Sequence, residues 1–114
     1  MVNFSEVSKA ETIRKLNDEF RRTLAGGKIM LTPGVSNLDA TSMELALAHL
    51  KAFENFSPDN DPYGEHDFGS FEIAGQKLFF KIDYYDPGLE FGSEDPADPS
   101  KTTRVLTLML AEEY

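Results

Sequence analysis

The sequence predicts one α+β domain over residues 1–114, in which two helices pack on a mainly antiparallel sheet in the order α-β-α-β-β-β. Two periodicities support this fold class. Apolar residues recur every three or four positions in two segments of the first half, and they alternate with polar residues in much of the second half. Composition is the third observation. Hydrophobic residues make up 40% of the chain, with nine Phe and four Tyr, which is enough for a packed core.

The first helix is expected to begin with the capping-box pattern of residues 8–11, in which Ser and Glu bond each other's free backbone N–H groups. Its apolar positions form one stripe: Ile13, Leu16, Phe20 and Leu24. Charged residues are expected on the other faces, and Arg21 and Arg22 also suit the negative end of the helix dipole. The glycine pair at 26–27 ends the helix, since glycine tolerates a left-handed backbone.

Residues 28–32 predict a short strand that Pro33 terminates, and residues 35–38 predict a connector that could add a second piece of strand. A second capping box at residues 41–44 predicts the start of the second helix. Its apolar positions are Met43, Leu47 and Leu50. Pro58 marks the latest residue at which this helix can end.

Three strands are expected to follow, at residues 67–73, 77–86 and 102–111. The first two are joined by a turn at residues 74–76, where glycine can supply the positive φ that a hairpin needs. The last strand is apolar on both faces, which is typical of a strand in the middle of a sheet. Helices followed by such a meander predict helices on one face of the sheet.

The negative charge is concentrated in one segment. The chain carries a net charge of −9, and residues 54–98 hold twelve acidic residues but only two basic ones. The remaining residues hold eight acidic and nine basic ones. Such a segment repels nucleic acid, whose phosphates bind Lys and Arg, and it attracts basic protein surfaces or cations. Solubility alone is the alternative explanation for the charge.

Composition excludes several classes of protein. The absence of cysteine excludes disulfides, zinc–thiolate sites and cysteine nucleophiles. No apolar run approaches the roughly 18 residues that cross a bilayer, so no membrane association is expected. Residues 1–10 do not resemble a signal peptide, so we expect a cytoplasmic protein.

The first of the acidic loops offers a candidate metal site. Oxygen ligands and one imidazole could suit a divalent cation, and the candidate ligands are Asp61, Glu65, His66 and Asp67. No other cofactor is expected. The loop lacks the spacing of a calcium-binding EF-hand, and Asp and Asn beside Pro and Gly are also ordinary turn formers.

Acid–base catalysis is a second hypothesis for the same loop. His66 could act as a general base oriented by Asp67, Asp83 or Glu65. No nucleophile motif accompanies it, and a single His beside acidic residues can equally fix a loop by hydrogen bonding. The last strand also contains Arg104, which is expected to form an ion pair with Asp83, Asp86 or Asp98.

The leading hypothesis is a non-catalytic binding protein whose acidic segment mimics the charge of nucleic acid and engages a basic protein surface, such as that of a nucleic-acid-binding protein. Direct binding to nucleic acid is not expected. Tyr63, Phe79 and Tyr85 could supply apolar anchors. The candidate binding residues are Asp59, Asn60, Asp61, Tyr63, Glu65, His66, Asp67, Tyr85 and Asp86. The hypothesis requires the acidic loops before and after the hairpin to lie close together.

Several motifs resemble those of a known family. They are NDPYGEHDFGSF at residues 60–71, KIDYYD at 81–86, GSEDPADP at 92–99 and TRVLTLMLAEEY at 103–114, together with LNDEFRRTL and GG at 16–27. The chain from about residue 13 onward resembles small bacterial proteins grouped as a domain of unknown function. The resemblance implies no activity and no catalytic residues. It does imply an association with plasmid and phage genes, and with it a host-takeover or anti-defence role.

Overall fold

The computed structural model describes residues 4–114, with side chains from residue 9 onward. The helices are α1 (Phe4–Thr23), the short α2 (Pro33–Ser36) and α3 (Ala40–Ala52), with single 3-10 turns η1 (Pro99–Lys101) and η2 (Ala111–Glu113). The strands are β1 (Gly27–Leu31), β2 (Phe68–Ile73), β3 (Gln76–Tyr85) and β4 (Thr103–Leu110). Among the described helices, none combines the length and hydropathy needed to cross a membrane.

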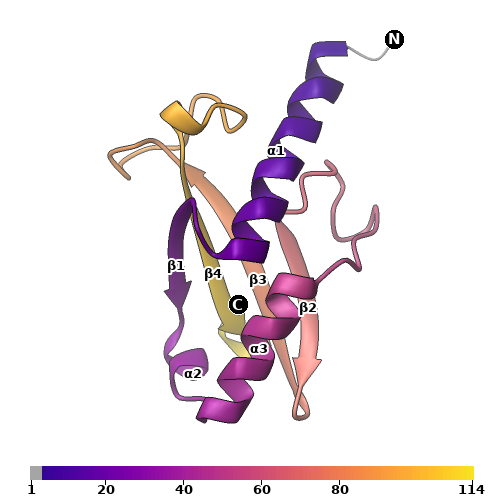
Figure 1. Ribbon diagram of the computed structural model, residues 1–114, viewed down its shortest axis with the longest axis vertical. Coiled ribbons are helices and arrows are strands. Elements are labelled where there is room, and N and C mark those ends of the chain that lie inside the picture. The colour runs from indigo at the N-terminus through magenta and orange to yellow at the C-terminus, as the bar shows by residue number, and fades with distance from the viewer. Residues whose placement is uncertain (1–3) are drawn as a thin grey trace.

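The four strands form one mixed sheet in the order β1-β4-β3-β2, and α1 and α3 cover one of its faces (Figure 1). The α+β class is therefore confirmed. The β3 strand pairs antiparallel with both β2 and β4, whereas β1 pairs parallel with β4. As predicted, β4 lies inside the sheet. The predicted element order is not matched fully, because residues 33–36 form the helix α2 instead of a second piece of strand. A proline at the first position of α2 explains the helix, since its fixed φ suits a helix start.

The start of α1 differs from the prediction. The helix begins at Phe4, so Ser8 lies within it and is not its N-cap. Serine inside a helix costs only about 0.5 kcal/mol relative to alanine, so a capping-box pattern alone does not force a start. The C-terminal end lies close to the predicted one. There, Leu24 and Gly26 both take left-handed backbone conformations after the last turn.

The start of α3 also differs, because its N-cap is Asp39 and not Thr41. The Asp39 carboxylate accepts a 2.7 Å hydrogen bond from the backbone N–H of Ser42. This hydrogen bond lowers the pKa of Asp39 below its ordinary value, which keeps the side chain ionised at the positive end of the helix dipole. A carboxylate outcompetes the hydroxyl two residues later for this position.

The β2–β3 hairpin forms as predicted. Ile73 pairs with Gln76, and the two residues between them, Ala74 and Gly75, both have positive φ. Two successive positive φ angles define a turn whose twist matches that of the flanking strands. The pairing places Leu78 and Phe80 on the buried face of β3, in agreement with the predicted alternation.

The core fills the space between the sheet and the two long helices. Its fully buried members include Val35, Leu50, Leu78, Phe80, Leu106 and Leu108. Gly69 of β2 lies under the rings of Phe53 and Phe80, where a β-carbon would come within 2.5 Å of either ring. Glycine is therefore required here by packing, although its φ is ordinary.

We expect Gly69→Ala to lower the free energy of unfolding by about 1–3 kcal/mol, because the added methyl overpacks the aromatic core. Urea denaturation measures this loss. Gly88→Ala is the matched control, since a β-carbon there meets nothing closer than 3.7 Å. Equal stability of the two variants would contradict the packing argument.

Candidate interaction site on the two acidic loops

The acidic segment forms two loops, here called the first acidic loop (residues 54–67) and the second acidic loop (residues 86–98). Both lie at the same end of the sheet, on either side of α1 (Figure 1). One polar network connects them. The Asn17 amide of α1 donates to the carbonyl oxygen of Glu65 at 3.0 Å and to the Tyr84 hydroxyl at 2.8 Å. Its oxygen accepts from Nε of Arg104 at 2.7 Å. The two loops are thus linked by a shared network at one end of the sheet, with α1 between them (Figure 1).

The second acidic loop joins this network through Arg104, whose Nη2 donates to the carbonyl oxygen of Pro96. The guanidinium is buried and lies 5.2 Å from the centre of the Tyr84 ring. Burial lowers its pKa. The predicted ion pairs of Arg104 with Asp83, Asp86 or Asp98 are wrong, because its partners in the described chain are a neutral amide and a carbonyl. Asn17, which sequence reasoning did not consider, occupies the place expected for a carboxylate.

The network continues from Tyr84 to the first acidic loop. The Tyr84 hydroxyl donates a 2.8 Å hydrogen bond to the Glu65 carboxylate. Burial, followed by this hydrogen bond, raises the pKa of Tyr84 far above its ordinary value, so the phenol stays protonated. Glu65 is therefore fixed by its carbonyl and its side chain together, and it does not extend toward a ligand.

Two other predicted binding residues, Asn60 and Asp61, stabilise the first acidic loop by hydrogen bonds to its backbone. The Asp61 side chain is buried, and its Oδ1 accepts from the backbone N–H groups of Glu65 and His66 at 3.0 and 3.1 Å. Asn60 accepts in the same way from Ser57 N–H at 2.9 Å. These are the turn-forming bonds that short polar side chains make with a nearby backbone. They place Asn60 and Asp61 in structural roles.

His66 has a different partner from those predicted. Its Nδ1 lies 2.8 Å from Oδ1 of Asp18 on α1, and its ring stacks on Phe56 with 3.8 Å between ring centres. Its Nε2 lies 3.7 Å from the Asp61 carboxylate. His66 also has a φ of +57°, an uncommon conformation for a residue with a β-carbon. The ring thus ties the first acidic loop to α1.

Asp18 forms an ion pair with Arg21, and the position of Arg21 also differs from the prediction. It was expected on a polar face of α1 but is only 1% exposed. Its Nε and Nη2 donate to the carbonyl oxygens of Leu50 and Phe53, at 3.1 and 2.8 Å, and its Nη1 contacts Asp18 at 3.1 Å. Arg21 therefore caps the C-terminal end of α3 and not that of α1.

The candidate catalytic and metal residues do not form a set of metal ligands. Asp83 forms an ion pair with Lys81 at 3.0 Å. Asp67 is half-buried, and that burial, with the charge of Glu65 as the next cause, raises its pKa. Among the side chains that the structure describes, no three acidic or histidine residues are arranged to hold a metal ion. The metal hypothesis therefore has no ligand set to support it.

Exposed aromatic residues mark both acidic loops. Tyr63 on the first loop is 79% exposed, and Phe91 on the second is 70% exposed. Tyr85 is exposed as expected, whereas Phe79 packs against Phe68 and Tyr114 and is not available as an anchor. Phe91 was missed because the alternation of the preceding strand ends before it.

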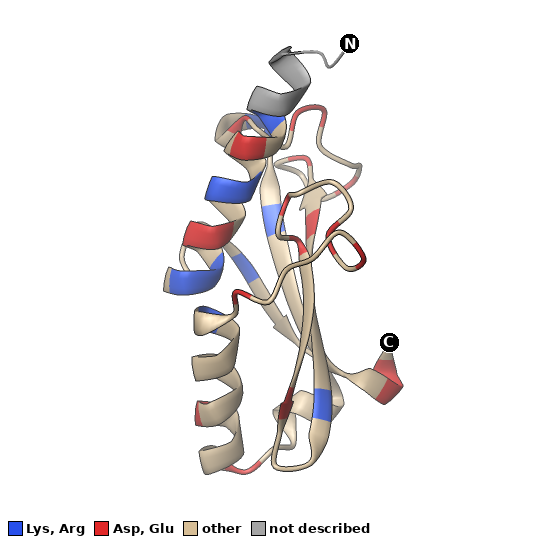
Figure 2. Cartoon of the chain, turned by 90° about the vertical axis from the view of Figure 1, so that its right-hand side faces the viewer, with Lys and Arg blue, Asp and Glu red and all other residues tan. Residues whose placement is uncertain are grey.

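The exposed acidic residues of the two loops are Glu54, Asp59, Glu90 and Glu94. Figure 2 shows acidic residues on both loops, with most of the basic residues of this end on α1. A partner that approaches the loops thus meets exposed carboxylates and two exposed aromatic rings.

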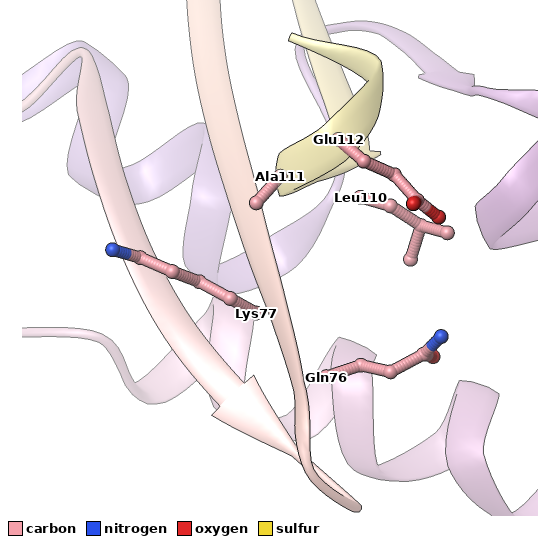
Figure 3. Close-up of a pocket in the computed structure, with 5 residues that line it drawn as sticks. All are labelled: Gln76, Lys77, Leu110, Ala111 and Glu112. Carbon is pink, nitrogen blue, oxygen red and sulfur yellow. The ribbon is translucent and has the colours of Figure 1, made fainter.

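A hollow of about 220 Å³ lies at the opposite end of the sheet, beside the β2–β3 turn (Figure 3). Its lining residues are Gln76, Lys77, Leu110, Ala111 and Glu112. The Lys77 side chain points away from the others (Figure 3). With one base and one acid, it brings together no chemistry that suits a ligand, and it does not belong to the candidate site.

We expect Asn17→Leu to lower the free energy of unfolding by about 3 kcal/mol or more, because it leaves Nε of the buried, charged Arg104 without an acceptor. Urea denaturation measures the loss. Asn55→Leu is the matched control, since Asn55 is exposed. An Asn17 variant as stable as the control would show that the network does not support the loops.

Asp67 makes stability depend on pH. Its pKa in the folded protein is raised above the ordinary value of 3.8. The stability that protonated Asp67 contributes is therefore complete below pH 3.8. It is lost as the pH rises through the pKa of Asp67 in the folded protein. We expect Asp67→Asn to raise the melting temperature at pH 7, and the gain to shrink as the pH approaches 4. Calorimetry over this range, with the exposed Asp59→Asn as control, checks the sign. A gain that does not change with pH would contradict it.

One family model matches this chain. It is described as "Protein of unknown function (DUF3768)", and it covers residues 31–113. No curated protein and no solved structure gives a significant match. The matched range includes both acidic loops and all of the sheet except the first residues of β1. The chain belongs to the DUF3768 family.

Proposed function

We propose that the protein is a non-catalytic binding module that presents its two acidic loops to a basic surface of another protein, as a charge mimic of nucleic acid. One observation carries the proposal: Tyr63 and Phe91 stand exposed on two acidic loops that a shared internal network holds at one end of the fold. Exposed aromatic residues ringed by polar groups are frequent anchors of protein interfaces.

The charge supports a basic partner. Among the described residues, the exposed carboxylates of Asp59, Glu90 and Glu94 take part in no ion pair or hydrogen bond that binding would have to break. Asp98 accepts hydrogen bonds from Ser100, which lower its pKa and keep it ionised. Such a field accelerates association with a positive surface and weakens as salt is added.

The loops are also ordered before any partner arrives. The first acidic loop is fixed through Asn17, Asp18 and Asp61, and the second through Arg104 and its own backbone hydrogen bonds. A surface that is already ordered loses less conformational entropy on binding, so more of the contact energy appears as affinity.

The acid–base alternative has one observation in its favour, the 2.8 Å contact between His66 and Asp18. A general base needs a ring nitrogen that faces its substrate. The other nitrogen of His66 faces the Asp61 carboxylate, and Phe56 covers one side of the ring. Among the described residues, neither Asp67 nor Asp83, the other candidate catalytic residues, forms a hydrogen bond or ion pair with His66. A loop-fixing role accounts for every contact of the ring, so we propose binding and not catalysis.

A nucleic-acid-binding protein is the proposed partner class, because a mimic of the phosphate backbone fits surfaces that evolved to bind phosphates. We further propose a bacterial, cytoplasmic setting and an origin on mobile elements. There, such a protein could block a host defence or replication protein. The motif resemblance supports this setting.

A pull-down from nuclease-treated bacterial lysate tests the proposal. We expect a nucleic-acid-binding protein to be retained at about 50 mM salt, released at about 500 mM, and displaced by duplex DNA. Neutralising three exposed loop acids (Asp59→Asn, Glu90→Gln, Glu94→Gln) should abolish retention.

The matched control neutralises three exposed acids outside the loops (Glu19→Gln, Glu44→Gln, Glu112→Gln) and should bind as the unmodified protein does. Retention that survives high salt, or that the loop variant and the control lose equally, would overturn the proposal.

A further inference from the structure

We propose that a hollow beside Phe91 receives an arginine side chain of the basic partner. This inference rests on the proposed function and specifies its contact chemistry. The hollow has a volume of about 420 Å³ and lies on the second acidic loop. Its lining residues are Asp86, Pro87, Phe91, Gly92, Glu94, Ser100 and Lys101.

The loop presents Phe91 on a rigid support. A bridge between Tyr85 and Gly92 extends the β3 strand pattern past its end. Asp86 N–H donates to the Phe91 carbonyl at 2.7 Å, and Ser93 N–H donates to the Tyr84 carbonyl at 3.1 Å. These bonds hold the backbone on both sides of Phe91, a residue that is 70% exposed.

The turn that carries Phe91 contains a strained residue. Leu89 has a φ of +59°, where a residue with a β-carbon is disfavoured by about 1–2 kcal/mol. Its side chain is 43% exposed, so core packing does not explain the choice of leucine where glycine would be unstrained. An apolar side chain kept in a strained, exposed turn beside Phe91 is consistent with a contact surface.

The hollow combines an aromatic wall with carboxylates. Asp86 and Glu94 line it together with the exposed ring, and Lys101 is the one base in the lining. The Asp86 side chain is positioned by a 3.0 Å hydrogen bond from Glu90 N–H to its Oδ1. The lining thus combines apolar surface with a net negative charge.

This combination selects arginine over lysine. A guanidinium is planar and weakly hydrated, so it can stack on an aromatic face while its N–H groups reach a carboxylate. A lysine ammonium is a strongly hydrated point charge, and it gains less from the ring. Electrostatic attraction alone gives arginine and lysine similar affinities. A higher affinity for arginine is therefore evidence for binding in the hollow beside Phe91, and not only for attraction to the acidic loops.

Hexa-arginine and hexa-lysine peptides serve as probes in calorimetric titrations at low salt. We expect hexa-arginine to bind roughly fivefold more tightly than hexa-lysine. Phe91→Ala should reduce the affinity for hexa-arginine to that for hexa-lysine and leave hexa-lysine unchanged. Asp86→Asn with Glu94→Gln should weaken both. Leu45→Ala, which alters an exposed apolar residue on α3, is the control and should change neither.

The outcomes separate this inference from the proposed function. Equal affinity for the two peptides, or an arginine preference that survives Phe91→Ala, would overturn the hollow as an arginine receptor. If binding of both peptides still requires the exposed loop acids, the proposed function stands without it. If neither peptide binds, both fail. Phe91→Leu, which keeps an apolar side chain but removes the aromatic face, should lose the preference as fully as the alanine variant.

Discussion

The structure depends on one buried amide. Asn17 lies on the apolar stripe of α1, is fully buried, and satisfies three polar groups from three separate parts of the chain. Without it, Nε of the buried Arg104 guanidinium and the Glu65 carbonyl would each lose a hydrogen bond. A buried polar group without a partner costs about 1–3 kcal/mol, and a charged one costs more. Asn17 therefore fixes the first acidic loop directly through Glu65 and the second through Arg104. The positions of both loops thus depend on α1.

The features that the sequence predicts well are local. The hairpin follows from Ala74-Gly75 and the alternation around it, and the buried face of β3 follows from the same pattern. Helix starts are less determined, because Asp39, Thr41 and Ser42 are all competent caps and only the folded backbone selects one. The parallel pairing of β1 with β4 could not be predicted, since it joins segments that carry no mutual signal.

The polar core was missed for a related reason. Hydropathy patterns assign Asn and Arg to the surface, so Asn17 and Arg21 were not assigned to the core. Their spacing did contain a signal, because positions 13, 17, 20, 21 and 24 all fall on one face of a helix. Asp18, the partner of His66, carried no such signal. Its role depends on where the first acidic loop packs against α1, and the local sequence does not determine that tertiary contact.

The parallel β1–β4 pair has a consequence for how the chain acquires its fold. The hydrogen bond between Asn17 and Arg104 spans 87 residues, and, within the described part of the chain, β1 pairs only with β4 at residues 103–110. During synthesis, α1 and β1 must wait for almost the entire domain before their partners exist. The hairpin of β2 and β3 can form much earlier, since its contacts are short in sequence. Until β4 is synthesised, the backbone N–H and C=O groups along one edge of β3 have no strand partner. Such unpaired strand edges associate with other chains. We therefore expect the nascent chain to be most prone to aggregation before β4 pairs with β3.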